Sequence, residues 1–198
     1  SHAGVSIGED GPSQMALEDL AMMRSVAGST VLYPSCATAA ADLTRQMADR
    51  DGISYLRTTR EKTAVLYGPD ERFPVGGSKV LRSSASDAAA VIAAGITLHE
   101  ALRAHDRLAA EGVRVRVVDL YSVKPVDAAT VEGCARECGG RIVVVEDHFP
   151  EGGLADAVSE VFAGRPAPAI TRLAVRALPG SGTPRELLDE AGIGADAI

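Results

Sequence analysis

The sequence contains few cysteines, and those present do not suit a disulfide framework. Cys36, Cys134 and Cys138 are odd in number, and the last two lie four residues apart on a predicted helix. Small domains held together by disulfides usually carry more cysteines, in even number. We therefore interpret all three as packing residues of a reduced, cytoplasmic protein.

Long hydrophobic runs and an excess of basic charge are also missing. No apolar run reaches the roughly 18 residues that a membrane helix needs, and no basic stretch followed by an apolar one marks a signal peptide. The formal net charge is −7. We therefore expect a soluble protein with no membrane partner and no nucleic acid as its main partner. A small anionic substrate stays open, because it needs only one local positive group.

Hydrophobic residues make up 46% of the 198 residues, which allows one large domain or two small ones. In the first part, the pattern predicts a helix over 12–27, a strand over 29–34, a helix over 37–50 and a strand over 53–58. A polar stretch with glycine and proline over 61–77 follows, and we interpret it as a linker between domains.

The second part alternates strands and helices. Strands are predicted over 79–83, 89–95, 113–120, 141–147 and 169–175, and helices over 96–112, 127–140 and 152–164. Thr97 and Glu100 are spaced as a capping box, and Thr183 is placed as the cap of a last short helix that begins at Pro184. Such alternation predicts βαβ units, so the expected class is α/β with a doubly wound, mostly parallel sheet.

Polar residues gather in the glycine-rich opening of the chain. Residues 8–12 precede the first predicted helix, where free backbone N–H groups can meet an anion, or the acids can serve as plain caps. Arg60 follows a predicted strand end, and ligands of open α/β sheets collect at such ends. Together with His2, Asp10 and Gln14, this arginine indicates a polar cleft near one edge of a sheet.

A second polar group lies at a strand end in the second part of the chain. Glu146, Asp147 and His148 end a predicted strand and precede Gly152 and Gly153. A ligand could bind at such a place. We favour the alternative, in which these residues shape the loop or form an interface.

Four segments resemble transketolases. The run SHAGVSIGEDGPSQMALEDLAMMRS is similar to a loop and helix of the transketolase pyrimidine-binding domain, in its animal-type form, and ISYLRTTR is similar to a later strand of that domain. VVDLYSVKPVD and RIVVVEDHFPEGGLADAV resemble the C-terminal domain of these thiamine-diphosphate enzymes. The resemblance implies a partial pyrimidine-binding α/β domain over 1–63, a linker over 64–78 and a C-terminal α/β domain over 79–198.

The resemblance also implies roles for single residues. His2 matches the loop histidine that contacts the sugar near its carbonyl end, which makes it the candidate catalytic residue and a substrate-binding one. Asp10 matches the aspartate that binds a substrate hydroxyl, and Gln14 stands where the animal-type glutamine lies near both thiamine and substrate. Arg60 matches the arginine that grips the sugar phosphate, a role that suits a guanidinium because it forms paired hydrogen bonds and stays charged. Arg57, earlier on the same strand, is the second choice.

Two parts of a transketolase active site have no counterpart in these 198 residues. In the family, the glutamate that activates the cofactor and the motif of the Mg²⁺ site both lie upstream of the opening loop. The resemblance therefore implies a C-terminal portion that is inactive alone, with no metal ligand and with most of the site for thiamine diphosphate and Mg²⁺ outside the chain. It implies sugar phosphates as substrates, and a homodimer or a partner chain that carries the pyrophosphate-binding domain.

Two alternatives stay open. The KPxD segment also occurs in deoxyxylulose-phosphate synthases, although the SQM segment after GEDGP disfavours such an enzyme. The chain is also compatible with a non-catalytic module for dimerisation or regulation. An activating glutamate and a metal motif immediately upstream in the gene would favour the enzyme.

Overall fold

A computed structural model describes residues 3–198 of the chain. The strands are β1 (Thr30–Leu32), β2 (Ser54–Leu56), β3 (Lys79–Arg82), β4 (Ala90–Ala93), β5 (Arg116–Asp119), β6 (Ser122–Lys124), β7 (Arg141–Glu146) and β8 (Ala169–Ala174). The helices are α1 (Asp19–Ser25), α2 (Ala37–Ala48), α3 (Ile96–Ala110), α4 (Ala128–Glu137), α5 (Leu154–Glu160) and α6 (Pro184–Glu190), and 3₁₀ turns cover Val5–Asp10 and Pro12–Gln14. Within these residues no helix is long and apolar enough to cross a membrane.

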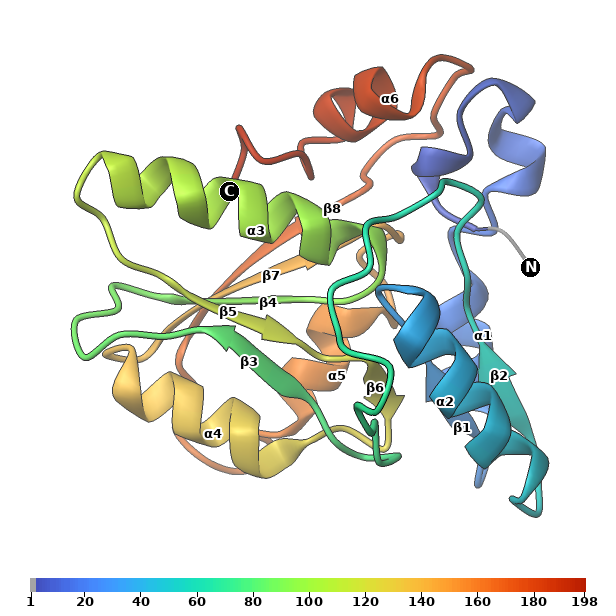
Figure 1. Cartoon of the computed structure of the whole chain (residues 1–198), viewed down its shortest axis with the longest axis horizontal. Helices are drawn as coiled ribbons and strands as arrows, with labels where there is room; N and C mark the ends of the chain where they lie inside the picture. The colour runs from blue at the N-terminus through green and yellow to red at the C-terminus, as the bar shows by residue number, and fades with distance from the viewer. Residues whose placement is uncertain (1–2) are drawn as a thin grey trace.

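The larger sheet has the strand order β3-β5-β4-β7-β8 (Figure 1). Its central strand β4 is parallel to β5 and β7, β7 is parallel to β8, and only the edge strand β3 runs antiparallel. Side chains alternate between the two faces of a strand. Ala90 and Ile92 thus pack with α4 and α5 on one face, and Val91 and Ala93 pack with α3 and α6 on the other. Helices on both faces confirm the predicted α/β class and the mostly parallel sheet.

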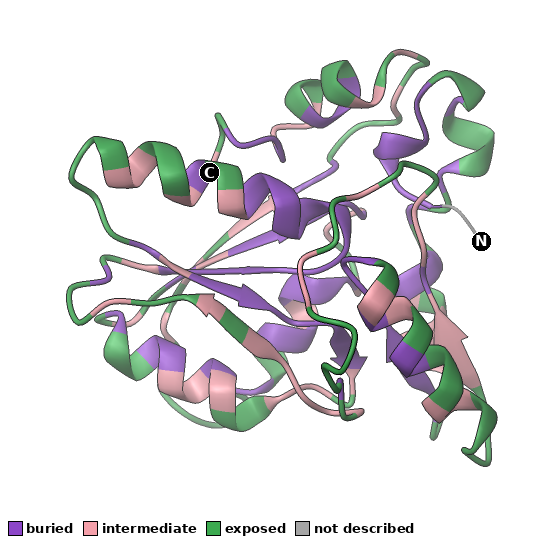
Figure 2. Ribbon diagram, viewed as in Figure 1, coloured by how far each residue is buried: buried purple, intermediate pink, exposed green. Residues whose placement is uncertain are grey.

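Figure 2 shows that the central strands of this sheet are buried, whereas the edge strand β3 is partly exposed. Every residue of β4 is buried, and so are the last three residues of β7. A strand covered on both sides needs apolar residues at every position, which explains the unbroken run Ile142–Val145.

The smaller sheet joins the two parts of the chain. Its order is β2-β1-β6, with β1 parallel to β2 and antiparallel to β6. Strand β6 lies more than sixty residues after β2 and was not predicted as a strand. Next to it, the Nζ of Lys124 donates to the carbonyl oxygens of Arg24 and Val26, both at 2.7 Å. The KPxD segment therefore ties the first part of the chain to the second.

Two local predictions were wrong. The helix expected over 12–27 begins only at Asp19, because Gly11 (φ 79°) and Ala16 (φ 47°) have left-handed backbones that end helical turns. The capping box expected at Thr97 does not form, because its hydroxyl donates instead to the carbonyl oxygens of Ala94 and Val145, both at 2.9 Å. The cap at Thr183 is confirmed, with both bonds of a capping box to Glu186 present.

Candidate functional site

The opening loop brings Asp10 and Arg60 together. Asp10 ends the first 3₁₀ turn, Arg60 follows β2, and their side chains form an ion pair. The pair lies at the surface, with 51% of the Arg60 side chain and 32% of the Asp10 side chain exposed. Gln14, also exposed, ends the second 3₁₀ turn of the same loop. His2 lies outside the residues that the structure describes.

Backbone hydrogen bonds hold this loop in a defined shape. The Ala3 amide donates to the Thr58 carbonyl at 2.9 Å, just beyond β2, and the Gly4 amide donates to the Met15 carbonyl at 2.6 Å. Val5, Ile7 and Met15 are buried beneath it. Gly8 (φ 80°) packs closely on α6, since an added Cβ would lie 3.1 Å from Pro184. Asp10 and Gln14 therefore project from a folded segment, which fixes their positions relative to Arg60.

A hollow of about 370 Å³ opens beside this ion pair. Its walls are mainly the segments that follow three strands: residues 34–37 after β1, residues 58–59 and 61–63 on either side of Arg60 after β2, and Gly95 after β4. Arg60 itself does not line the hollow. These are the carboxyl ends of parallel strands, where open α/β sheets bind their ligands. The volume is within the range of small-molecule sites.

Residues 1–65 match the family model described as transketolase, pyrimidine binding domain, and residues 78–198 match the model described as transketolase, C-terminal domain. The chain belongs to the transketolase family. It is 52% identical to a transketolase of Rattus norvegicus over all 198 residues, and 50% identical to transketolase-like protein 1 of Bos taurus. It spans 32% and 33% of the length of these two relatives.

A solved structure of this family is similar throughout. This split-gene transketolase, an inactive beta4 tetramer, superimposes with a TM-score of 0.87 and 32% identity, and the match covers 99% of this chain and 61% of that one. The transketolase fold therefore includes the opening loop, the smaller sheet and the larger sheet, which is the sheet of the C-terminal domain.

Arg57 does not share a face with Arg60. Strand β2 ends at Leu56, and the Arg57 side chain turns inward, where it is fully buried. Its Nε donates to Oδ2 of Asp19 on α1 at 3.0 Å, and its guanidinium lies 4.7 Å from the centre of the Tyr33 ring. The second choice for the phosphate contact is therefore an internal cation of the transketolase fold, and Arg60 is the exposed one.

A buried carboxyl group beside the hollow was missed in the sequence. Asp119 ends β5 and is fully buried, and it accepts hydrogen bonds from Ser35 at 2.8 Å and from Tyr67 at 2.6 Å. Burial raises its pKa to about 7, although both hydrogen bonds oppose the rise. Ser35 in turn accepts from the Gly95 amide at 3.0 Å. Asp119 thus links the ends of β5, β1 and β4 beneath the hollow. An acid at the end of a mostly buried strand was the available signal.

The group Glu146, Asp147 and His148 lies inside the protein. All three side chains are buried, and Nε2 of His148 accepts from the Ala21 amide at 3.4 Å. Burial lowers the pKa of His148, and the charge of Arg57 lowers it further. The group therefore packs against the first part of the chain.

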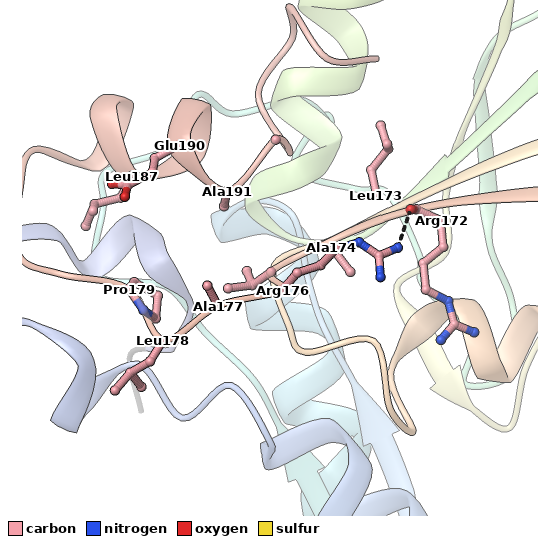
Figure 3. A pocket seen from close by; sticks show the side chains of 12 residues that line it. Arg172, Leu173, Ala174, Arg176, Ala177, Leu178, Pro179, Leu187, Glu190 and Ala191 are labelled. Carbon is pink, nitrogen blue, oxygen red and sulfur yellow. Dashed lines mark hydrogen bonds between the residues drawn. The ribbon is translucent and has the colours of Figure 1, made fainter.

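Another hollow, of about 380 Å³, lies between the segment after β8 and α6 (Figure 3). Leucine, alanine and proline side chains form most of its wall, and Arg172, Arg176 and Glu190 also line it. None of the residues predicted for the site lines it. Of the transketolase motifs, Thr58 and Thr59 of the segment ISYLRTTR line the first hollow instead.

Proposed function

We propose that this chain supplies part of the active site of a transketolase, which transfers a two-carbon ketol unit from a ketose phosphate to an aldose phosphate with thiamine diphosphate. The observation that carries the proposal is the exposed pair Asp10–Arg60 beside a hollow at the carboxyl ends of parallel strands. We also propose a cytoplasmic location, and a division into a pyrimidine-binding part over 1–63, a linker over 64–78 and a C-terminal domain over 79–198.

Arg60 has the properties of a phosphate ligand. Its guanidinium is half exposed, carries a permanent charge and can form two parallel hydrogen bonds to phosphate oxygens. In the absence of substrate, Asp10 holds it in place. When a sugar phosphate enters, the phosphate would replace part of this ion pair, which frees a carboxylate oxygen of Asp10 to accept a hydrogen bond from a sugar hydroxyl. His2 is proposed to contact the carbonyl end of the sugar.

Thiamine diphosphate supplies the carbon nucleophile of this reaction when it is bound. The fit of the described residues to this cofactor is partial: Gln14 presents an exposed amide on the same loop as Asp10, and it can contact both cofactor and substrate. Residues 3–198 contain no group of three or more His, Cys, Asp or Glu side chains that could hold a metal ion. Mg²⁺ therefore does not fit these residues, and we assign it no ligand in this chain.

We propose that a second chain takes part in the site. We propose either a second copy in a homodimer or a partner that carries the pyrophosphate-binding domain. The split-gene transketolase of similar fold is itself an assembly of several chains, a beta4 tetramer that is inactive. The chain on its own is expected to be inactive.

Arg60→Ala in the holoenzyme that contains this chain tests the proposal. Loss of a charge-assisted pair costs about 1.5–3 kcal/mol, so we expect KM for phosphorylated sugars to rise roughly 10- to 150-fold. KM for the matching unphosphorylated sugars should change little, because these sugars lack the group that Arg60 binds. Steady-state kinetics with both substrate types measure the difference.

Arg45→Ala is the matched control. Arg45 is also an exposed, ion-paired arginine, but it lies on α2 and pairs with Asp42. It should leave both KM values unchanged. An equal rise for both substrate types in Arg60→Ala would contradict the assignment. No ketol transfer by the wild-type holoenzyme would favour a non-catalytic module.

A further inference from the structure

A carboxylate of the C-terminal sheet holds the start of the opening loop. The Val5 amide donates to Oδ1 of Asp147 at 2.8 Å, across 142 residues of sequence. Asp147 directly follows β7, and its side chain is only 1% exposed. Its second oxygen, Oδ2, has no hydrogen-bond partner among the described residues. The hydrogen bond that this carboxylate accepts therefore comes from the loop.

The packing between Gly4 and Asp147 leaves no room for a side chain at position 4. Gly4 has a left-handed backbone (φ 88°), and an added Cβ would overlap the carboxylate of Asp147. Any side chain at position 4 would therefore separate the loop from Asp147. Only glycine permits both this backbone shape and this approach.

The residues next to Asp147 make two further contacts of the same kind. The Phe149 amide donates to the Leu17 carbonyl at 3.0 Å, and Nε2 of His148 accepts from the Ala21 amide. The His148 carbonyl accepts from the Val175 amide at 3.0 Å, just beyond β8. Residues 147–149 thus form a strip, anchored in the C-terminal sheet, that binds the opening segment at three places.

Arg57 provides the charge that lets Asp147 stay buried. Its guanidinium is fully buried, and Nη1 and Nη2 have no hydrogen-bond partner among the described residues. Burial raises the pKa of Asp147, and the positive charge of Arg57 opposes the rise. The Ala3 amide donates to the carbonyl of Thr58, the residue after Arg57, and the Val5 amide donates to Asp147. The first residues of the loop therefore lie between the end of β2 and Asp147.

A short, folded segment connects Val5, which is bonded to Asp147, with Asp10 of the candidate site. Val5 begins the 3₁₀ turn that Asp10 ends, and Val5 to Gly8 are buried. The segment is kinked at Gly8 (φ 80°, ψ −123°), and Gly8 packs against Pro184, so the turn that begins at Val5 determines where the residues up to Asp10 start. A displacement at Val5 therefore changes the position of Asp10 relative to Arg60.

We propose that Asp147 is a positioning residue, which fastens Val5 and thereby sets the position of Asp10 opposite Arg60. The statement about substrate rests on the proposed function, whereas the fastening of the loop does not. In this arrangement the C-terminal domain takes part in substrate binding without contacting substrate. Asp147 affects substrate binding only through the position of the opening loop.

Asp147→Leu tests the fastening, with Glu146→Met as its control. Each variant removes one buried carboxylate at the end of β7, but Glu146 faces α5, where it accepts from the Ala155 amide at 3.3 Å. Hydrogen exchange of the chain, measured by NMR, should be about tenfold faster at the Val5 amide in Asp147→Leu. Exchange within β7 and β8 should stay close to that of the wild type. Glu146→Met should leave the Val5 amide protected.

Gly4→Ala tests the same contact from the loop side, and it covers the case in which Asp147→Leu does not fold. Gly28→Ala is the matched control, because Gly28 also has a positive φ (70°) but has no atom within 4 Å of an added Cβ. Both variants carry the same kind of backbone strain, and only Gly4→Ala collides with Asp147. Rapid exchange at Val5 is expected only in Gly4→Ala.

The kinetic readout uses the holoenzyme. A displaced Asp10 should raise KM for sugar phosphates about tenfold in Asp147→Leu and Gly4→Ala, with a change in kcat below about twofold. A general loss of structure would instead lower kcat through a smaller active fraction and leave KM unchanged.

Three results would overturn the proposal: an unchanged Val5 exchange rate in Asp147→Leu, an equal change in the control variants, or faster exchange at Val5 with an unchanged KM. Failure of the proposed function is a separate result. In that case the wild-type holoenzyme shows no ketol transfer, while the exchange difference at Val5 persists.

Discussion

Arg57→Met would remove a fully buried cation from the junction between the opening segment and the C-terminal domain. In the folded protein Arg57 pairs with Asp19 at 3.0 Å and lies over the ring of Tyr33. Asp147 is close enough for its charge to act on Arg57. Methionine has a similar length and no charge. The substitution therefore leaves two buried carboxylates without their shared positive partner.

The expected cost is large because the environment excludes water. Removal of one partner of a buried ion pair typically destabilises a protein by about 3–5 kcal/mol. The cation–π contact with Tyr33 adds about 0.5–2 kcal/mol. The loss of two buried NH2 groups without partners among the described residues, Nη1 and Nη2, offsets part of this cost. We therefore expect the free energy of unfolding to fall by about 3 kcal/mol or more.

Urea denaturation of the chain, followed by circular dichroism, measures this change. Arg60→Met is the matched control: its ion pair with Asp10 is half exposed, so the cost should be about 0–1 kcal/mol. The double variant Asp19→Asn/Arg57→Met should recover part of the loss, because it removes one orphaned charge. Equal costs for Arg57→Met and Arg60→Met would refute the reasoning, and so would a double variant less stable than the sum of its parts.

Two further predictions concern single side chains. Because burial raises the pKa of Asp119 to about 7, above an unfolded value of about 3.9, its contribution to stability falls as the pH rises from about 4 to 7. Asp119→Asn should therefore be more stable than the wild type above pH 7 and similar to it at pH 4; a difference independent of pH in urea denaturation would contradict this. Thr183→Ala should lower the free energy of unfolding by about 1 kcal/mol, since it removes the cap of α6. An unchanged urea midpoint would show that this cap does not contribute to stability.

Local signals in the sequence were sufficient to predict those structural features that depend only on neighbouring residues. The run Ile142–Val145 is apolar at every position and forms a strand covered on both faces. The cap at Thr183 depends only on Glu186, three residues later. The prediction of helix from residue 12 failed because Met15 and Leu17 are buried by a folded loop and not by a helix face.

Asp10 and Arg60 form an ion pair, and their roles in substrate binding stay predictions. The family motif ranked Arg60 above Arg57, but the local pattern of the strand could not show that the Arg57 side chain turns inward. Whether a side chain turns inward after a strand ends depends on what lies next to it. Here Asp19 and Tyr33 contact Arg57. The residues next to Arg57 in the sequence do not indicate these partners.

By itself, the sequence determined the order of most strands and helices, the α/β class and the family, because each of these depends on residues near one another or on motifs of consecutive residues. Tertiary structure alone decided that β6 joins the sheet of the first part of the chain and that Asp147 holds Val5. These contacts join residues that lie far apart in the sequence. Their energy comes from burial and from satisfied hydrogen bonds, which exist only after the chain has folded.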